Sequence, residues 1–205
     1  MYHWRKTMNK IKEVEQYARE KLVTEVTAHD FEHTSRVFKM ATHIGKKLNA
    51  DIEVIQVASL THDIIDKKVS SNIVESKDDI IRKLTSLGYE SLFIKHVFSI
   101  IENMSYSSGR TPESLEGKIV QDADRIDAIG AIAIARAFAY GGAMNRKIYE
   151  EGSAECSIAH FYDKLLLLKE NLNTDIAKEI AISRHTFMED YLTQFHKEWK
   201  FKDTQ

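Results

Sequence analysis

A histidine and two aspartates lie near the end of one apolar stretch. His62-Asp63 closes the run that begins at Ala58, and Asp66 follows three residues later. A buried apolar helix excludes charge unless the charge is paired or bound to a metal. If the stretch is an α-helix, His62 and Asp63 point about 100° apart and Asp66 lies on the His62 face. Imidazole and carboxylate together suit a divalent cation, although a helix cap or a surface pair would have the same sequence.

A second histidine is predicted to face the same core. His33 lies one turn before Val37, on the stripe of a predicted helix, and His62 lies on the stripe of the next predicted helix, which begins after Asp51. Residues three or four apart share a helix face, so both imidazoles would point inward. A single core histidine is usually structural, whereas two of them beside Asp63 favour a metal site.

Three aspartates form another cluster: Asp122, Asp124 and Asp127. Asp124 and Asp127 share a helix face, and Asp122 points elsewhere. The acids would be an exposed helix surface on one interpretation. Because Ala123 and Ile126 indicate a packed side at the same place, the acids are instead expected to lie next to a buried stretch.

Composition excludes some classes of function. The chain has 205 residues, 43% hydrophobic, and a net charge of −2, so a nucleic-acid partner is not expected. Cys156 is the only cysteine, which indicates a reducing, cytoplasmic location. The start of the chain lacks the apolar core of a signal peptide. The apolar stretch 128–144 contains Arg136 and is shorter than a membrane span, so a buried helix is predicted and no membrane partner is expected.

Helical spacing recurs along the whole chain, and alternating strand patterns are absent. The sequence therefore predicts an all-α fold of about seven to eight helices in a single domain, residues 1–205. Its motif core spans about 29–142, and C-terminal helices at 154–200 pack on that core. Helices are expected at about 4–23, from 33, from 52, from 76 after a loop at 67–75, at 91–103, at 115–140, at 154–171 and at 175–200.

The last of these helices carries an expected inner stripe, namely Ala177, Ile180, Arg184, Phe187, Tyr191 and Phe195. Phe195, Trp199 and Phe201 form an aromatic tail. The tail could pack against a partner subunit, as in a homodimer, or close the core of its own chain.

Taken together, the candidate ligands come in the order H…HD…D: His33, His62-Asp63 and Asp124. The sequence resembles the HD-domain metal-dependent phosphohydrolases, and among them the bacterial YpgQ/YedJ-type group. Three stretches carry the resemblance: His29-Asp30-Phe31-Glu32-His33 with Arg36-Val37, then Leu60-Thr61-His62-Asp63, then Gln121-Asp122-Ala123-Asp124-Arg125-Ile126-Asp127-Ala128-Ile129-Gly130. The third stretch is the most specific.

The resemblance implies a set of roles. His33, His62, Asp63 and Asp124 become the metal ligands, because the family pattern Ala-Asp-Arg selects Asp124 over Asp122. Asp127 would not bind the ion itself but would orient one of the residues that do.

Other residues are candidates for the chemistry around that metal. Asp66 is the candidate to position or deprotonate a water, although the family often has glutamate there. His29, Arg36, Lys67 and Arg125 are candidates for phosphate binding. Each of these cations could instead be a surface residue, and Arg125 could be a structural ion-pair partner.

The implied activity is hydrolysis of a small phosphorylated substrate, with one divalent ion as cofactor. Two histidines favour Mn²⁺, and Mg²⁺, Fe²⁺, Co²⁺, Ni²⁺ and Zn²⁺ are compatible. The group implies pyrophosphohydrolysis of nucleoside or deoxynucleoside triphosphates to monophosphate and pyrophosphate. A nucleoside 5′-monophosphate phosphatase, a phosphodiesterase or an alarmone hydrolase would use the same ligands. Two alternatives are not enzymes: a nucleotide-binding regulatory module with a vestigial metal site, and an interaction protein with a buried salt-bridge network.

Overall fold

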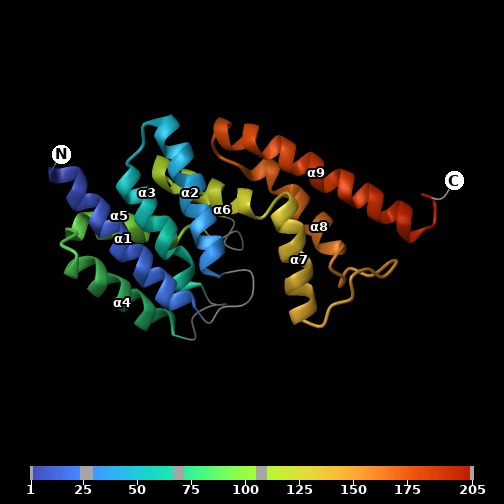
Figure 1. The fold of residues 1–205 in the computed structure, drawn as a ribbon, viewed down its shortest axis with the longest axis horizontal. Coiled ribbons are helices and arrows are strands. Elements are labelled where there is room, and N and C mark those ends of the chain that lie inside the picture. The colour runs from blue at the N-terminus through green and yellow to red at the C-terminus, as the bar shows by residue number, and fades with distance from the viewer. Residues whose placement is uncertain (1, 24–29, 67–71, 105–109, 204–205) are drawn as a thin grey trace. The chain divides into compact units, whose positions relative to one another are not determined.

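The computed structural model describes residues 2–23, 30–66, 72–104 and 110–203 (Figure 1). The α-helices are α1 (Tyr2–Leu22), α2 (Phe31–Leu48), α3 (Ile52–Thr61), α4 (Ile73–Ser86), α5 (Ser91–Ile101), α6 (Leu115–Asp127), α7 (Ala131–Ala143), α8 (Ala159–Asp163) and α9 (Asp175–Trp199). Three short 3₁₀ helices are η1 (His62–Ile65), η3 (Leu165–Leu167) and η4 (Lys169–Asn171). These described ranges contain no strand, which confirms the all-α prediction, with slightly more helices than expected.

The chain forms two compact units, the first ending at Asp124 and the second beginning at Arg125. The boundary passes through the last turn of α6. That all 205 residues form one domain stays a prediction.

Helix α3 is the centre of the first unit, since it packs against α1, α2 and α5 (Figure 1). Almost every residue of α3 from Val54 onward is buried, as its apolar sequence predicts. Gly45 lets α2 approach α3 closely, because a Cβ at this position would lie 2.6 Å from Ile55 Cδ1. The two helices that carry the candidate histidines are therefore packed directly against each other.

Side-chain caps start α2, α3 and α4. The Asp51 carboxylate accepts hydrogen bonds from the backbone N–H groups of Glu53 and Val54, as predicted. Helix α4 begins at Ile73, so the prediction of a loop through residue 75 and a helix from residue 76 is wrong. Asn72 accepts from the Glu75 backbone N–H and donates to the Glu75 carboxylate, each at 3.2 Å. This side-chain cap starts the helix three residues earlier than predicted.

Helix α3 does not continue through the His-Asp pair. It ends at Thr61, residues 62–65 form the 3₁₀ helix η1, and Asp66 has extended backbone angles (φ −71°, ψ 137°). The α-helical argument that placed Asp66 on the His62 face is therefore wrong. The hydroxyl of Thr61 donates to the Val57 carbonyl oxygen at 2.8 Å, a back-bond that competes with the helix ladder where the change occurs.

The predicted single helix over 115–140 is two helices, α6 and α7, bent by 71°. Gly130 separates them with φ +90°, a left-handed conformation that glycine adopts without strain. The carbonyl groups left at the end of α6 accept from arginines: Arg184 Nη1 donates to Ile126 at 2.8 Å and Arg136 Nη1 to Asp127 at 3.3 Å. These contacts stabilise the bend.

The apolar stretch around α7 is only partly buried. Ala133, Ile134 and Gly141 are buried, whereas Ile132 is 44% exposed, so the helix is less buried than predicted. Within the described residues, no individual helix has the length and apolar character to cross a membrane. α6 and α7 meet that test only as a bent pair.

The segment after α7 differs from the predicted helix over 154–171. It is broken into α8, η3 and η4, with Lys164 (φ −141°, ψ −58°) interrupting the helix after α8. Apolar residues three or four apart along this segment are nevertheless all buried, namely Ile158, Phe161, Leu165 and Leu168. Their spacing of three or four residues fits both α-helical and 3₁₀-helical turns. The sequence pattern therefore indicates which side of the segment is buried, but not where the helix is interrupted.

Helix α9 begins after Thr174, as the predicted bounds 175–200 require, but its buried face is not the predicted one. Phe187 is 51% exposed, and the buried residues are Ala177, Ala181, His185, Met188 and Leu192. Two residues of the aromatic tail contact their own unit, since the Tyr149 ring lies 5.8 Å from Phe195 and 5.0 Å from Trp199, whereas Phe201 is 78% exposed.

The contribution of Gly130 to the bend can be tested by substitution. Gly130→Ala should lower stability by about 1–3 kcal/mol, because alanine resists positive φ. The new Cβ would also lie 3.0 Å from Arg184 Cβ. Thermal denaturation measures the loss.

The matched control is Gly142→Ala in α7, where a Cβ meets nothing within 4 Å. This variant should melt at the wild-type temperature or slightly above it. Equal melting temperatures for the two variants would contradict the role of Gly130.

Candidate metal centre

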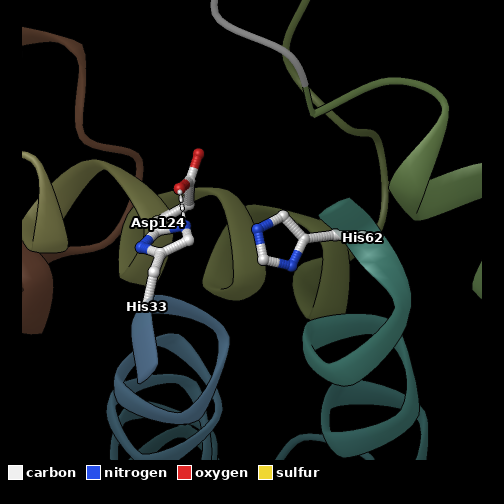
Figure 2. Close-up of side chains that lie close together, drawn as sticks. All are labelled: His33, His62 and Asp124. Atoms are coloured by element: carbon white, nitrogen blue, oxygen red, sulfur yellow. Dashed lines mark ion pairs between the residues drawn. The ribbon is translucent and has the colours of Figure 1, made fainter. Parts of the chain in front are cut away.

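Three side chains from separate helical segments converge in the first unit (Figure 2). His33 comes from the first turn of α2, His62 from η1 and Asp124 from the last turn of α6. One potential ligand atom of each lies within 4.8 Å of the other two. Asp63 lies beside both imidazoles, with Oδ2 3.4 Å from His33 Nε2 and Oδ1 3.3 Å from His62 Nε2. The structure thus brings together the residues that the H…HD…D order singled out.

Local structure at the end of α3 positions His62 and Asp63. The last carbonyl groups of a helix lack partners within the helix. One of them, the Ser59 carbonyl, lies 2.8 Å from His62 Nδ1. A carbonyl oxygen only accepts, so Nδ1 carries the proton and Nε2 is directed toward Asp63 and His33. Sequence reasoning missed this contact, whose only signal is that residue 59 lies three positions before His62 in a helix that is about to end.

The cluster is buried and places two imidazoles beside a carboxylate. His33, His62 and Asp63 are all buried, while the Asp124 side chain is 33% exposed. Among the described residues, none is placed to hydrogen-bond His62 Nε2, which lies 3.3 Å from Asp63 Oδ1. Because Nδ1 donates to the Ser59 carbonyl, the Nε2 lone pair points at a carboxylate oxygen, which is repulsive. A cation bound between these atoms would offset this repulsion.

The donor set fits a divalent cation. The group offers imidazole nitrogens and carboxylate oxygens and no thiolate, a combination that suits borderline and hard metals. Ligands at about 2.0–2.2 Å from one ion lie at most about 4.4 Å apart. Small side-chain movements would therefore bring the three atoms within range. A buried imidazolium–carboxylate network remains the alternative, and it requires no metal.

The predicted water-positioning and phosphate-binding residues are placed less closely. Asp66 follows η1 and is half-buried, and Arg36 is half-buried on α2, three residues after His33. Arg125 is buried and donates to the Asn171 carbonyl oxygen, as a structural cation would. His29 and Lys67 lie outside the described residues. The roles assigned to all five stay predictions.

The remaining acids of the third motif differ in their surroundings. Asp127 is buried and pairs with Arg136, whose Nη1 lies 2.6 Å from Asp127 Oδ2. Its proposed role behind a metal ligand stays a prediction. Asp122 is fully buried, whereas Asp124 lies 3.3 Å from His33 Nε2. The contact with His33 supports Asp124 over Asp122 as the candidate ligand.

Comparison with known proteins agrees with this geometry. The HD domain model matches residues 30–129, a range that includes all four candidate ligands. YpgQ from Bacillus subtilis is 39% identical over 198 residues, covering 93% of this chain and 96% of YpgQ. The chain belongs to the HD-domain family.

Solved structures of this HD-domain family are also similar. The crystal structure of Bacillus subtilis YpgQ in complex with ADP matches with a TM-score of 0.81 and 39% identity, covering 92% of this chain and 97% of YpgQ. An HD-superfamily hydrolase from Bacillus thuringiensis has the same TM-score and identity, with coverages of 95% and 98%. The family supports a hydrolase, and the His/His/Asp cluster could hold the divalent metal that HD domains bind.

The two neighbouring acids provide a test of the ligand set. Asp124→Asn should weaken binding of Mn²⁺ strongly, because a neutral amide replaces a carboxylate beside His33. Asp122→Asn should weaken it less, since this residue points elsewhere. Elemental analysis of the purified proteins and titration with Mn²⁺ give the comparison.

The outcomes separate the alternatives. A larger loss in Asp122→Asn would show that the wrong acid was chosen. Wild-type protein without stoichiometric metal, and without affinity for added metal, would favour the imidazolium–carboxylate network.

Proposed function

We propose that the protein is a divalent-metal-dependent phosphohydrolase that converts nucleoside or deoxynucleoside triphosphates to monophosphate and pyrophosphate. The observation that carries the proposal is the buried group of two imidazoles and the Asp63 carboxylate, next to the partly exposed Asp124. Membership of a family with hydrolase members supports the reaction class. The structure of YpgQ with ADP supports a nucleotide as the substrate.

His33, His62, Asp63 and Asp124 would hold the ion. When bound, the ion would neutralise phosphate oxygens and lower the pKa of a water. The two imidazole donors favour Mn²⁺ over Mg²⁺. The incomplete burial of Asp124 leaves one side of the cluster accessible, which a substrate phosphate requires.

The residues around the cluster would perform the remaining steps. Asp66 accepts a proton from the attacking water, whose oxygen forms a bond to the α-phosphorus. The bond from that phosphorus to the bridging oxygen breaks, and pyrophosphate leaves with the electron pair. Arg36, three residues after His33 on α2, would offset phosphate charge. The guanidinium keeps its charge throughout the reaction.

Identifying the products shows which phosphorus–oxygen bond is cleaved. Protein stripped with a chelator and supplied with Mn²⁺ should convert a deoxynucleoside triphosphate to monophosphate and pyrophosphate, as followed by phosphorus NMR. The activity should disappear when the chelator is restored. Orthophosphate as the product would contradict cleavage at the α-phosphorus and favour a phosphatase.

Asp66 is tested separately from the ligands. Asp66→Asn should keep wild-type affinity for Mn²⁺ but lower kcat by about 10²–10⁴-fold, because the amide cannot accept the proton. Asp78→Asn, an exposed residue on α4, is the matched control and should leave both quantities unchanged. If Asp66→Asn lost Mn²⁺ instead, Asp66 would be a ligand.

A further inference from the structure

His33 lies in the first turn of its helix. It is the third residue of α2, and the preceding described residue outside the helix is Asp30. The first turn of a helix lacks internal partners for its N–H groups and is the part that frays most readily. His62, by contrast, has its ring bonded to the Ser59 carbonyl. A ligand in a fraying turn needs some other contact to fix it.

Asp30 makes that contact with the backbone of the ligand itself. Its Oδ1 accepts a hydrogen bond from the His33 backbone N–H at 2.7 Å. The Asp30 carbonyl accepts from the Thr34 N–H at 3.2 Å. The N–H groups on both sides of the His33 side chain are therefore bonded to one residue. A bond from an N–H to an ionised carboxylate is among the stronger hydrogen bonds in proteins.

Phe31, the residue after Asp30, is also held in place by packing. Phe31 is buried, and the Arg19 guanidinium carbon from α1 lies 3.9 Å from the centre of its ring. Phe31 fixes the position of the turn against α1, while Asp30 fixes its hydrogen bonding. His33 then has one backbone position from which Nε2 reaches both Asp63 (3.4 Å) and Asp124 (3.3 Å).

We propose that Asp30 is a positioning residue for the metal centre: its carboxylate holds the backbone of His33 so that this imidazole is preorganised to bind the ion. In this role Asp30 contacts the backbone of His33 and binds neither the ion nor the substrate. The inference rests on the proposed function, in that His33 must be a metal ligand.

The chain contains a matched control. Asp51 caps α3 with the same chemistry, accepting from Glu53 N–H at 3.0 Å and from Val54 N–H at 3.2 Å. Val54 is the third residue of its helix, as His33 is of α2, but it is an apolar core residue. A cap that only stabilises its helix should behave alike at both positions, whereas a cap that positions a ligand should not.

The experiment compares four variants with wild type by titrating Mn²⁺ and following free Mn²⁺ by electron paramagnetic resonance, with thermal melting in parallel. Asp30→Ala should weaken Mn²⁺ affinity about tenfold, the usual effect of losing a residue that orients a ligand. Asp30→Asn should restore affinity to within about twofold, because asparagine caps as well as aspartate does. Asp51→Ala should lower the melting temperature comparably and keep wild-type affinity.

Asp30→Gly provides the same test if the alanine variant folds poorly, since glycine is tolerated at a helix start but offers no acceptor. Wild-type affinity in Asp30→Gly, or an equal loss in Asp51→Ala, would overturn the inference. Wild-type protein that binds Mn²⁺ but hydrolyses no nucleotide would overturn the proposed function and leave the affinity comparison decisive. Wild-type protein that binds no Mn²⁺ would overturn both.

Discussion

A buried carboxylate facing two imidazole nitrogens is the constraint on which the first unit depends. Asp63 is almost wholly removed from water, and each of its oxygens lies within 3.4 Å of a histidine Nε2. Removing a carboxylate from water costs several kcal/mol unless positive charge is nearby. The apolar core around α3 raises that cost, so a cation bound in the cluster would stabilise the buried carboxylate. The same desolvation strengthens every electrostatic contact within the cluster.

The side chains of the cluster all come from the ends of helices. His33 lies in a first turn, His62 and Asp63 lie just beyond the end of α3, and Asp124 lies in the last turn of α6. Helix ends offer backbone groups that are not yet bonded, which can orient side chains. Helix interiors between these ends supply the packing, notably where Gly45 lets α2 and α3 approach. Polar chemistry and apolar packing therefore use different parts of the same elements.

Much of the fold and of the candidate centre was predictable from the sequence. The apolar stripes and caps predicted most helices, and the order of His33, His62-Asp63 and Asp124 predicted which side chains converge. Local competition caused the errors. Asn72 caps α4 by accepting from the Glu75 backbone N–H, a start signal that lies before Ser76 and was overlooked. A back-bond from Thr61 accompanies the change to 3₁₀ helix that displaced Asp66.

Long-range contacts explain other differences. The bend at Gly130 depends on a close approach by Arg184, a residue 54 positions away that no local pattern reveals. On α9 the small residues Ala177 and Ala181 lie in the core, while Phe187 stays exposed. A stripe chosen by side-chain size therefore gave the wrong face, because packing space rather than hydrophobicity decides between adjacent stripes.

The two histidines are held by different kinds of hydrogen-bond acceptor, and this affects which substitutions the supporting positions tolerate. The acceptor for His62 Nδ1 is the main-chain carbonyl of residue 59, which any amino acid at that position supplies. The acceptor for the His33 backbone is the side chain of Asp30, which a single base change can remove. A substitution at residue 59 therefore leaves the acceptor for His62 in place. A substitution at residue 30 can remove the acceptor for the His33 backbone. Divergence within the first unit should be freer at residue 59 than at residue 30, although neither side chain binds the ion.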